Sequence, residues 1–139
     1  MRLYNKELNP DSLSPLTLAF TGDAVFSLYI REMLVSEANR PVGQLHKLSV
    51  GWVKAEAQSK GMHAILDLLT EKETEVFKRG RNAHTSHTPK NQSGCDYHYA
   101  TGFEALVGYL YLKDEVERLN FLLGEVIRCV GDDKGEEAP

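Results

Sequence analysis

Apolar residues recur at helical spacing along almost the whole chain, and this spacing limits the folds that the sequence can adopt. Ser14 and Pro15 are typical of an N-cap and a first helical position. The apolar stripe that follows them comprises Leu16, Ala19, Phe20, Phe26, Ile30 and Leu34. No segment alternates apolar and polar residues with period two for long enough to require a sheet. The pattern predicts an all-α protein whose first helix ends near Glu37.

Several shorter helices are predicted in the middle of the chain. The Asn-Arg-Pro segment at 39–41 ends the first helix, and a second amphipathic stretch follows it. Its apolar face comprises Leu45, Leu48, Trp52, Ala55 and Ser59. Gly61 is expected to interrupt this stretch before a short apolar helix over 62–69. The sequence TEKE at 70–73 resembles a capping box and starts a further helix, which is expected to end near Arg79–Gly80.

The segment from Gly80 to Asp96 is long, irregular and rich in Gly, Asn, Ser, Thr and Pro. A loop of this length in a small domain is usually functional or disordered. Helical spacing resumes at His98, and a last amphipathic helix is expected to begin near Val116 and to stop at Gly131. We therefore expect one domain over residues 1–131, followed by a disordered acidic tail over 132–139.

Composition narrows the class of protein. The 139 residues contain no apolar run of about 18 residues that would cross a membrane, and the N-terminal segment is too polar for a signal peptide. Cys95 and Cys129 lack further pairs that would form a disulfide framework, so both thiols are expected to be reduced. These features predict a soluble, cytoplasmic protein. The net charge of −4 argues against a polyanionic partner, although the charge is unevenly distributed.

Two acids fall on apolar helix faces. Asp23 lies one turn after Ala19 and Phe20, and Glu104 lies in the apolar run FEALVGYLYL at 103–112. Both are predicted to point inward or into a cleft, and each then needs a cation, a hydrogen-bond donor or a raised pKa. Gly22, beside Asp23, costs roughly 1 kcal/mol in mid-helix, which indicates that another backbone or a ligand comes close. Gly102 and Gly108 flank Glu104 in the same way.

Two explanations of these acids remain open. In the first, each acid is satisfied by a buried Arg, Lys or Tyr, and the glycines mark close contacts between helices. In the second, the acids converge on Mg²⁺, which takes oxygen ligands and often needs only one or two carboxylates. Such a site is suited to phosphodiester hydrolysis. A glycosidase also uses two carboxylates, but the chain has a single tryptophan, Trp52, for a sugar platform.

The densest positive segment is KRGRNAH at 78–84, with a further lysine beyond it. The residues that we expect to contact RNA are Lys78, Arg79, Arg81, Asn82, His84 and Lys90. Cations at a helix C-terminus also complement the helix dipole, which alone accounts for Lys78 and Arg79. It does not account for Arg81 and Lys90 on a loop, so nucleic-acid contact is the favoured interpretation.

Histidine and cysteine spacing raises one more alternative. His84 and His87, followed by Cys95 and His98, have spacings that a structural zinc site allows. The signal is weak, because these residues lie in a polar loop of a chain with an adequate apolar core. We favour loop histidines that lie near RNA.

The segments FTGDAVF at 20–26 and FEALVGYLYL at 103–112 resemble the two signature segments of the ribonuclease III catalytic domain. The resemblance covers roughly residues 10 to 130. It implies an all-helical, dimeric fold that cleaves double-stranded RNA with Mg²⁺. Asp23 and Glu104 match acids of the two segments, so the resemblance implies that both are catalytic residues and metal ligands.

Two positions depart from the family pattern. Ala19 stands where the family has a further metal-site glutamate, and Thr101 stands where it has an aspartate. Either the metal is held more through water, which Thr101 would orient, or activity is lost. These replacements, the short length and the RGRNAH–TPKN loop are similar to the Mini-ribonuclease III branch of the family, which is found in bacteria.

The branch resemblance implies a specific task. It implies an endoribonuclease that matures the ends of the 23S ribosomal RNA precursor at a double-stranded stem, with a large-subunit ribosomal protein as a partner. Mn²⁺ is expected to be able to replace Mg²⁺. The family also implies a homodimer, and Phe20 and Phe26 offer more apolar surface than one helix hides. The alternative is a non-catalytic factor that binds double-stranded RNA or assists ribosome assembly on the same scaffold.

Overall fold

The computed structural model describes residues 2–83 and 94–137, and it describes side chains as far as residue 131. Within these residues every regular element is a helix, which confirms the predicted all-α class. The elements in chain order are η1 (Pro10–Ser12), α1 (Pro15–Glu37), α2 (Val42–Val53), α3 (Ala55–Ile65), η2 (Leu66–Leu68), α4 (Glu71–Arg81), α5 (Gly94–Leu112) and α6 (Val116–Glu137).

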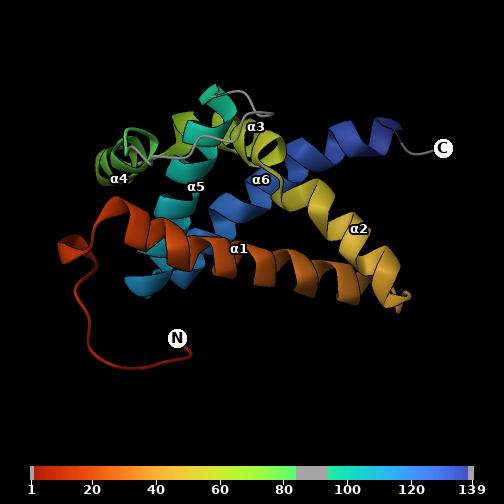
Figure 1. Cartoon of the computed structure of the whole chain (residues 1–139), viewed down its shortest axis with the longest axis horizontal. Coiled ribbons are helices and arrows are strands. Elements are labelled where there is room, and N and C mark those ends of the chain that lie inside the picture. The colour runs from red at the N-terminus through yellow and green to blue at the C-terminus, as the bar shows by residue number, and fades with distance from the viewer. Residues whose placement is uncertain (1, 84–93, 138–139) are drawn as a thin grey trace.

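The centre of the fold is α5, which contacts α1, α3, α4 and α6 (Figure 1). Every residue from Ala100 to Leu110 is buried except Glu104, which is partly exposed. A helix that is apolar on all sides is stable only inside the protein, so the sequence of α5 dictates its central position. Glu104 is the one acid in this buried run. Because other helices pack around α5, their arrangement determines which groups surround the Glu104 carboxyl group.

Two predicted helix starts are confirmed, and each has a local cause. Ser14 accepts a hydrogen bond from the backbone N–H of Thr17 at 3.2 Å, and Pro15 occupies the first turn of α1. Thr70 and Glu73 form a complete capping box at the start of α4, with reciprocal bonds of 3.1 and 2.8 Å. These local signals fix where α1 and α4 begin, independently of packing.

The break predicted at Gly61 is wrong. The chain instead turns at Lys54, whose extended backbone separates α2 from α3, and α3 continues through Gly61. A Cβ at Gly61 would lie 2.6 Å from a methyl group of Val126. Gly61 therefore allows α3 to pack closely against α6, and this packing outweighs the low helix propensity of glycine.

Two further helix boundaries differ from the prediction. The helix expected to resume at His98 begins earlier, at Gly94, so part of the expected loop is the first turn of α5. The stop expected at Gly131 is also wrong, because α6 continues to Glu137. Gly131 lies near the ring of Trp52, where a Cβ would be 3.5 Å from the indole, so this glycine lies where α6 faces α2 and does not end its helix. The division into a domain over 1–131 and a disordered tail over 132–139 stays a prediction.

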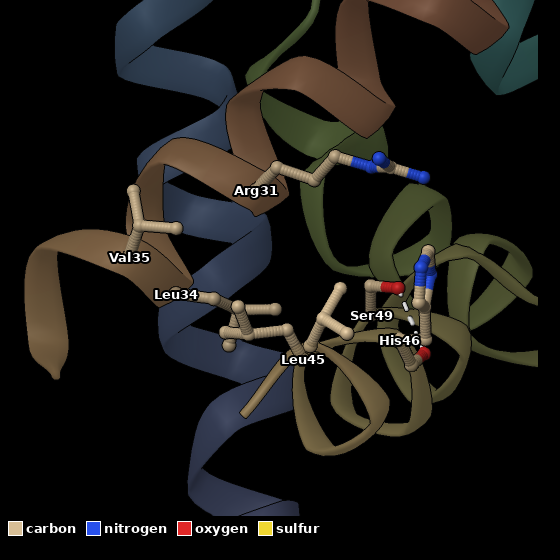
Figure 2. Close-up of a pocket in the computed structure, with 7 residues that line it drawn as sticks. Arg31, Leu34, Val35, Leu45, His46 and Ser49 are labelled. Atoms are coloured by element: carbon tan, nitrogen blue, oxygen red, sulfur yellow. Dashed lines mark hydrogen bonds between the residues drawn. The ribbon is translucent and has the colours of Figure 1, made fainter. Parts of the chain in front are cut away.

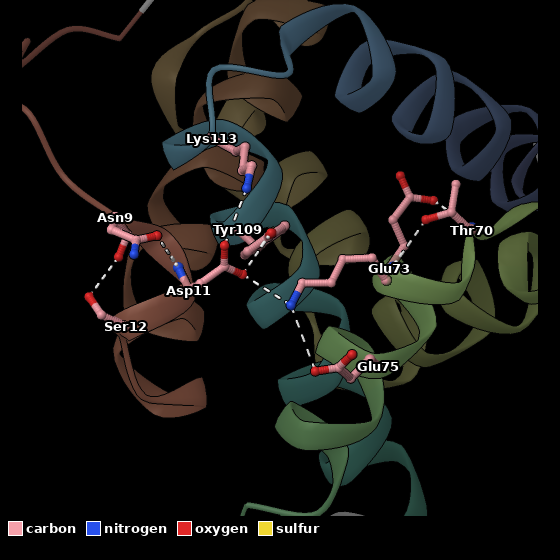
Figure 3. A network of polar contacts seen from close by, with 9 residues as sticks. Asn9, Asp11, Ser12, Thr70, Glu73, Glu75, Tyr109 and Lys113 are labelled. Carbon is pink, nitrogen blue, oxygen red and sulfur yellow. Dashed lines mark hydrogen bonds and ion pairs between the residues drawn. The ribbon is translucent and has the colours of Figure 1, made fainter.

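An ionic cluster around Asp11 fastens the N-terminal segment to the helices (Figure 3). The Asp11 carboxylate accepts hydrogen bonds from the Tyr109 hydroxyl at 2.9 Å and from the Lys113 ammonium at 3.2 Å, and it pairs with Lys72 at 3.0 Å. Hydrogen bonding to Lys72, Tyr109 and Lys113 lowers the pKa of Asp11 to about 2. The carboxylate therefore stays ionised and joins η1 to α4 and α5.

Across the described parts of the chain, no helix combines the length and the apolar character that crossing a bilayer requires.

Candidate active site

The two signature acids are brought together by a very close crossing of α1 and α5. A Cβ at Gly22 would lie 1.7 Å from the carbonyl oxygen of Glu104, and a Cβ at Gly108 would lie 2.0 Å from the carbonyl oxygen of Leu18. Only glycine fits at either position, because any side chain would overlap the facing backbone. This confirms the prediction that another backbone or a ligand comes close to Gly22, and the close neighbour is the backbone of α5. The crossing places Asp23 beside Glu104.

A second close contact holds α5 from the α4 side. A Cβ at Gly80 would lie 2.7 Å from the Cβ of Ala105, and a Cβ at Gly102 would lie 2.7 Å from the ring of Phe77. The turn of α5 that carries Glu104 is thus held between α1 and α4. Close-packed helices of this kind give the carboxyl group little freedom to move away.

The environment of Glu104 strongly favours its neutral form. Burial, the negative charge of Asp23 and a hydrogen bond with the Asp23 side chain together raise the pKa of Glu104 to about 8, while the Gln58 amide opposes this shift. A second negative charge beside Asp23 is unfavourable, so near pH 7 Glu104 tends to keep its proton. A cation between them would offset the part of the shift that the charge of Asp23 causes.

The two acids differ in exposure. Glu104 is partly buried, as predicted. Asp23 is exposed, so it does not point inward, and the predicted cleft at Asp23 stays a prediction. The apolar face of α1 was predicted from the spacing within that helix alone. Which part of this face is buried depends on where α5 packs against it. The pair therefore has one acid at the surface and one beneath it, and a solvent-borne ligand reaches it from the Asp23 side.

In the alternative explanation each acid is satisfied by a buried Arg, Lys or Tyr, and the cationic form of this alternative is not found among the described residues. In the described part of the chain, no lysine or arginine forms an ion pair with Asp23 or Glu104. The recorded donor to Glu104 is the neutral amide of Gln58, whose Nε2 lies 3.4 Å from Oε2. Gln58 was not predicted as a site residue. A polar glutamine on the apolar face just before Gly61 is the feature of the sequence that could have indicated it.

The two positions that lack the family's acids lie on the same helix faces as Asp23 and Glu104. Ala19 and Thr101 are both buried. The Thr101 hydroxyl donates to the carbonyl oxygen of Tyr97 at 3.0 Å, which leaves its lone pairs as acceptors. The role of Thr101 in orienting a metal-bound water stays a prediction.

The donor set of the acid pair suits Mg²⁺. No group of three or more His, Cys, Asp or Glu side chains converges within the described residues, so protein ligands alone would not build a closed metal cage there. Mg²⁺ is commonly held by one or two carboxylates together with water and substrate phosphates. Two adjacent carboxyl groups without a neutralising cation fit this requirement.

The predicted RNA-binding residues lie at the C-terminal end of α4. Lys78, Arg79 and Asn82 are exposed and line a shallow groove together with Leu69, Glu71, Thr74 and Glu75. Arg81 is held differently: its Nε donates to the Asn82 side chain at 3.1 Å, and its guanidinium lies 5.7 Å from the centre of the Phe77 ring. His84 and Lys90 lie outside the described residues, so their contribution stays a prediction.

The zinc alternative is not tested by the described residues. Cys95 is exposed and His98 is partly buried on the first turns of α5. His84 and His87, the other two candidate ligands, lie outside the described residues.

An apolar hollow lies between α1 and α2, apart from the acid pair (Figure 2). Its walls are Leu34, Val35, Val42 and Leu45, with Arg31, His46 and Ser49 at its edge. The Ser49 hydroxyl donates to the carbonyl oxygen of His46 at 2.9 Å. The hollow contains no acid, and its lining suits an apolar side chain better than a phosphate.

Several known proteins resemble this chain. The family described as Ribonuclease III domain matches residues 16–115. A Mini-ribonuclease 3 of Thermoanaerobacter sp. (strain X514) is 55% identical over 81% of this chain and 79% of that protein. A Mini-ribonuclease 3 of Symbiobacterium thermophilum is 43% identical over 89% of this chain and 92% of that protein.

A solved structure is also similar. The crystal structure of a Fusobacterium nucleatum protein superposes with a TM-score of 0.77 at 31% identity, over 84% of this chain and 93% of the other. The matched family spans both signature segments and the acid pair. The chain therefore belongs to the ribonuclease III family, in the branch of the Mini-ribonuclease 3 proteins, and is an endoribonuclease of that type.

Proposed function

We propose that this endoribonuclease cleaves double-stranded RNA with Mg²⁺, or with Mn²⁺ in its place, at the site formed by Asp23 and Glu104. The observation that carries the proposal is the carboxyl pair itself. Burial and the neighbouring Asp23 together raise the pKa of Glu104 to about 8, and no cationic side chain of the described residues neutralises the pair. A divalent cation would supply the missing positive charge.

The residues of the site have separate tasks in this proposal. Asp23, at the surface, would hold the cation against the scissile phosphate, and Glu104 would provide a second oxygen ligand from below, for which it would lose its proton. When bound, the ion supplies Lewis acidity for the attack of water and stabilises charge on the departing 3′-oxygen. Thr101 offers an acceptor oxygen on the same face of α5, where it would orient a water molecule.

The end of α4 provides the grip on the RNA in this proposal. Lys78 and Arg79 are exposed cations, and Asn82 beside them is a neutral hydrogen-bond donor. Such side chains contact the phosphates and 2′-hydroxyl groups of A-form RNA, whose deep major groove hides the base edges. Recognition by shape follows. His84 and Lys90, outside the described residues, are further RNA contacts that the sequence predicts.

We further propose that the protein acts as a homodimer through α1 and α2. Phe20 is 81% exposed, whereas Phe26, which was also expected to contribute, is in the core with its ring edge against Phe103. The other large apolar residues exposed on these two helices are Leu16, Leu28, Val35, Val42, Leu48 and Val50. Side chains of this kind on adjacent helices, beside the hollow of Figure 2, form a surface suited to a second copy.

The biological substrate that we propose is the stem formed by the ends of the 23S ribosomal RNA precursor, cleaved in the cytoplasm to leave a 5′-phosphate and a 3′-hydroxyl. A large-subunit ribosomal protein would present this stem. The support is membership of the Mini-ribonuclease 3 branch.

Cleavage of a long RNA duplex tests the reaction. We expect the wild-type protein to cut the duplex with Mg²⁺ and not with EDTA, and to leave a single-stranded control intact. Asp23→Asn should bind the duplex and fail to cut it. Binding without cleavage by the wild type would favour the non-catalytic alternative, and restoring acids at Ala19 and Thr101 would then be the next step.

Sedimentation tests the dimer. Phe20→Ser should convert a dimer into monomers at micromolar concentration, whereas Phe121→Ser, which removes a half-exposed ring from α6, should leave the dimer intact. A monomeric wild-type protein would contradict this part of the proposal.

A further inference from the structure

Gln58 is a buried polar residue beside Glu104, and the reaction proposed above gives it no role. It lies on the first turn of α3 and is only 2% exposed. A primary amide in such a place needs hydrogen-bond partners, because an unpaired buried polar group costs about 1–3 kcal/mol. The partners that Gln58 has therefore indicate what holds it there.

The amide nitrogen of Gln58 joins two acceptors that belong to different elements. Nε2 donates to the carbonyl oxygen of Val53, the last residue of α2, at 3.0 Å, and to Oε2 of Glu104 at 3.4 Å. A carbonyl oxygen only accepts, so the amide cannot turn its oxygen toward Val53 without losing the shorter bond. The orientation of the amide is thereby fixed, and its second N–H is directed at Glu104.

The oxygen atom of the same amide makes Gln58 unfavourable for stability at this position. Oε1 of Gln58 is buried and has no hydrogen-bond partner among the described residues. A glutamine that served only to cap α2 would use one N–H and would bring this uncompensated oxygen into the core. An apolar side chain would avoid the cost, and leaving the Val53 carbonyl uncapped is a smaller loss at a helix end.

We propose that Gln58 is a positioning residue of the active site. Its Nε2 ties the Glu104 carboxyl group to the end of α2, so that the group stays turned toward Asp23 when a divalent cation binds. The inference rests on the proposed function, since it assumes that Glu104 is a metal ligand. The break between α2 and α3 at Lys54 also has a role in this proposal. The break leaves the carbonyl group of Val53 available to accept the hydrogen bond that anchors Gln58.

Partners that orient a metal ligand are typically worth 10–100-fold in metal affinity or activity. The Gln58 to Glu104 bond is long, so we expect the lower end of that range. In Gln58→Met, which keeps the length of the side chain and removes both N–H donors, the Mg²⁺ concentration at half-maximal effect should rise about tenfold. The KM for RNA should stay at the wild-type value, because the side chain of Gln58 is buried and offers no surface for the duplex to contact.

The test measures the melting temperature and the duplex cleavage rate of the full chain at increasing Mg²⁺ for wild type, Gln58→Met and Ser59→Ala. Ser59 is buried to the same extent as Gln58 and lies one residue further along α3, so it controls for disturbed packing. The expected result is a higher Mg²⁺ midpoint in Gln58→Met alone. If Gln58→Met only lowers the melting temperature without Mg²⁺ and leaves the midpoint unchanged, the inference is overturned and Gln58 merely caps α2.

A second measurement needs no variant at Gln58. In the wild-type protein, the side-chain amide resonance of Gln58 should shift with Mg²⁺ at the midpoint of the thermal effect, and this shift should be absent in Asp23→Asn. The exposed amide of Gln44 on α2 is the internal control. A Gln58 resonance that does not respond while the protein is stabilised overturns this inference alone. A wild-type protein that neither cleaves nor is stabilised by Mg²⁺ overturns the proposed function as well.

Discussion

Two carboxyl groups in this molecule have opposite surroundings, although both are held by α5. Asp11 is bonded by Tyr109 of α5 and by two lysines, and its pKa falls to about 2 (Figure 3). Glu104 is partly buried against another carboxyl group and one neutral amide, and burial together with the charge of Asp23 raises its pKa to about 8. The first arrangement is complete and serves to attach the N-terminal segment. The second lacks positive charge, which is typical of a site that binds a cation.

The largest expected effect is on cleavage activity, which should depend on the carboxyl group of Glu104 and not on that of Asp11. Glu104→Gln and Asp11→Asn each remove one carboxylate, but only Glu104→Gln should abolish cleavage, by more than about a hundredfold, since a ligand matters more than its outer partners. Initial cleavage rates on an RNA duplex at saturating Mg²⁺ provide the measurement. Equal losses in the two variants would show that the difference in surroundings has no catalytic meaning.

The next effect concerns the helix crossing that creates the Glu104 site. Gly22→Ala should destabilise the fold by about 3 kcal/mol or more, because its Cβ would overlap the backbone of α5, which cannot yield as a side chain can. Urea denaturation measures the change. Gly124→Ala on α6 is the matched control: a Cβ there meets nothing within 4 Å, so the protein should gain up to about 1 kcal/mol. A mild effect at Gly22 would mean that the crossing adapts easily.

The two carboxyl groups should also respond to pH in opposite directions. The folded state binds the Glu104 proton more tightly than the unfolded state does, so raising the pH from about 4.5 to about 8 should lower the free energy of unfolding of the wild type relative to Glu104→Gln. For Asp11 the folded state binds the proton less tightly. Stability relative to Asp11→Asn should therefore be present above about 3.8 and be lost as the pH falls toward about 2.

Denaturation in EDTA, repeated across this pH range, measures both effects. The Asp11 effect should be the smaller of the two, because its ion pairs are exposed to solvent. A wild-type protein that gains stability relative to Glu104→Gln between pH 5 and 8 would contradict the assigned surroundings of Glu104.

The smallest expected effect is on RNA binding, and it compares a cationic side chain that already forms an ion pair within the protein with one that does not. Lys113 is held by Asp11, whereas no ion pair of the described residues involves Arg79. Arg79→Gln should reduce the slope of log affinity for duplex RNA against log salt concentration by about one, and Lys113→Gln should leave the slope unchanged. Binding titrations at several salt concentrations measure both slopes. An unchanged slope in Arg79→Gln would remove the end of α4 from the RNA interface.

Helical spacing allowed much of the site to be predicted, because the face on which a side chain lies depends only on its position within its own helix. It identified Asp23 and Glu104 as acids on apolar stripes, and it correctly treated Gly22 as a point of close approach. It failed at Gly61 and Gly131, where a glycine was expected to end a helix. Both glycines face another helix or ring, and the sequence does not reveal which neighbour will be present.

What the sequence determined by itself is local: the all-α class, the caps of α1 and α4, and the two acids with their glycines. Helix period and capping depend on residues within a few positions of each other. Only the tertiary structure decided that Asp23 is exposed, that Glu104 lies beneath it, and that Gln58 is the donor to Glu104. These facts depend on how α1, α3 and α5 cross, and the crossings are set by contacts between residues far apart in the chain.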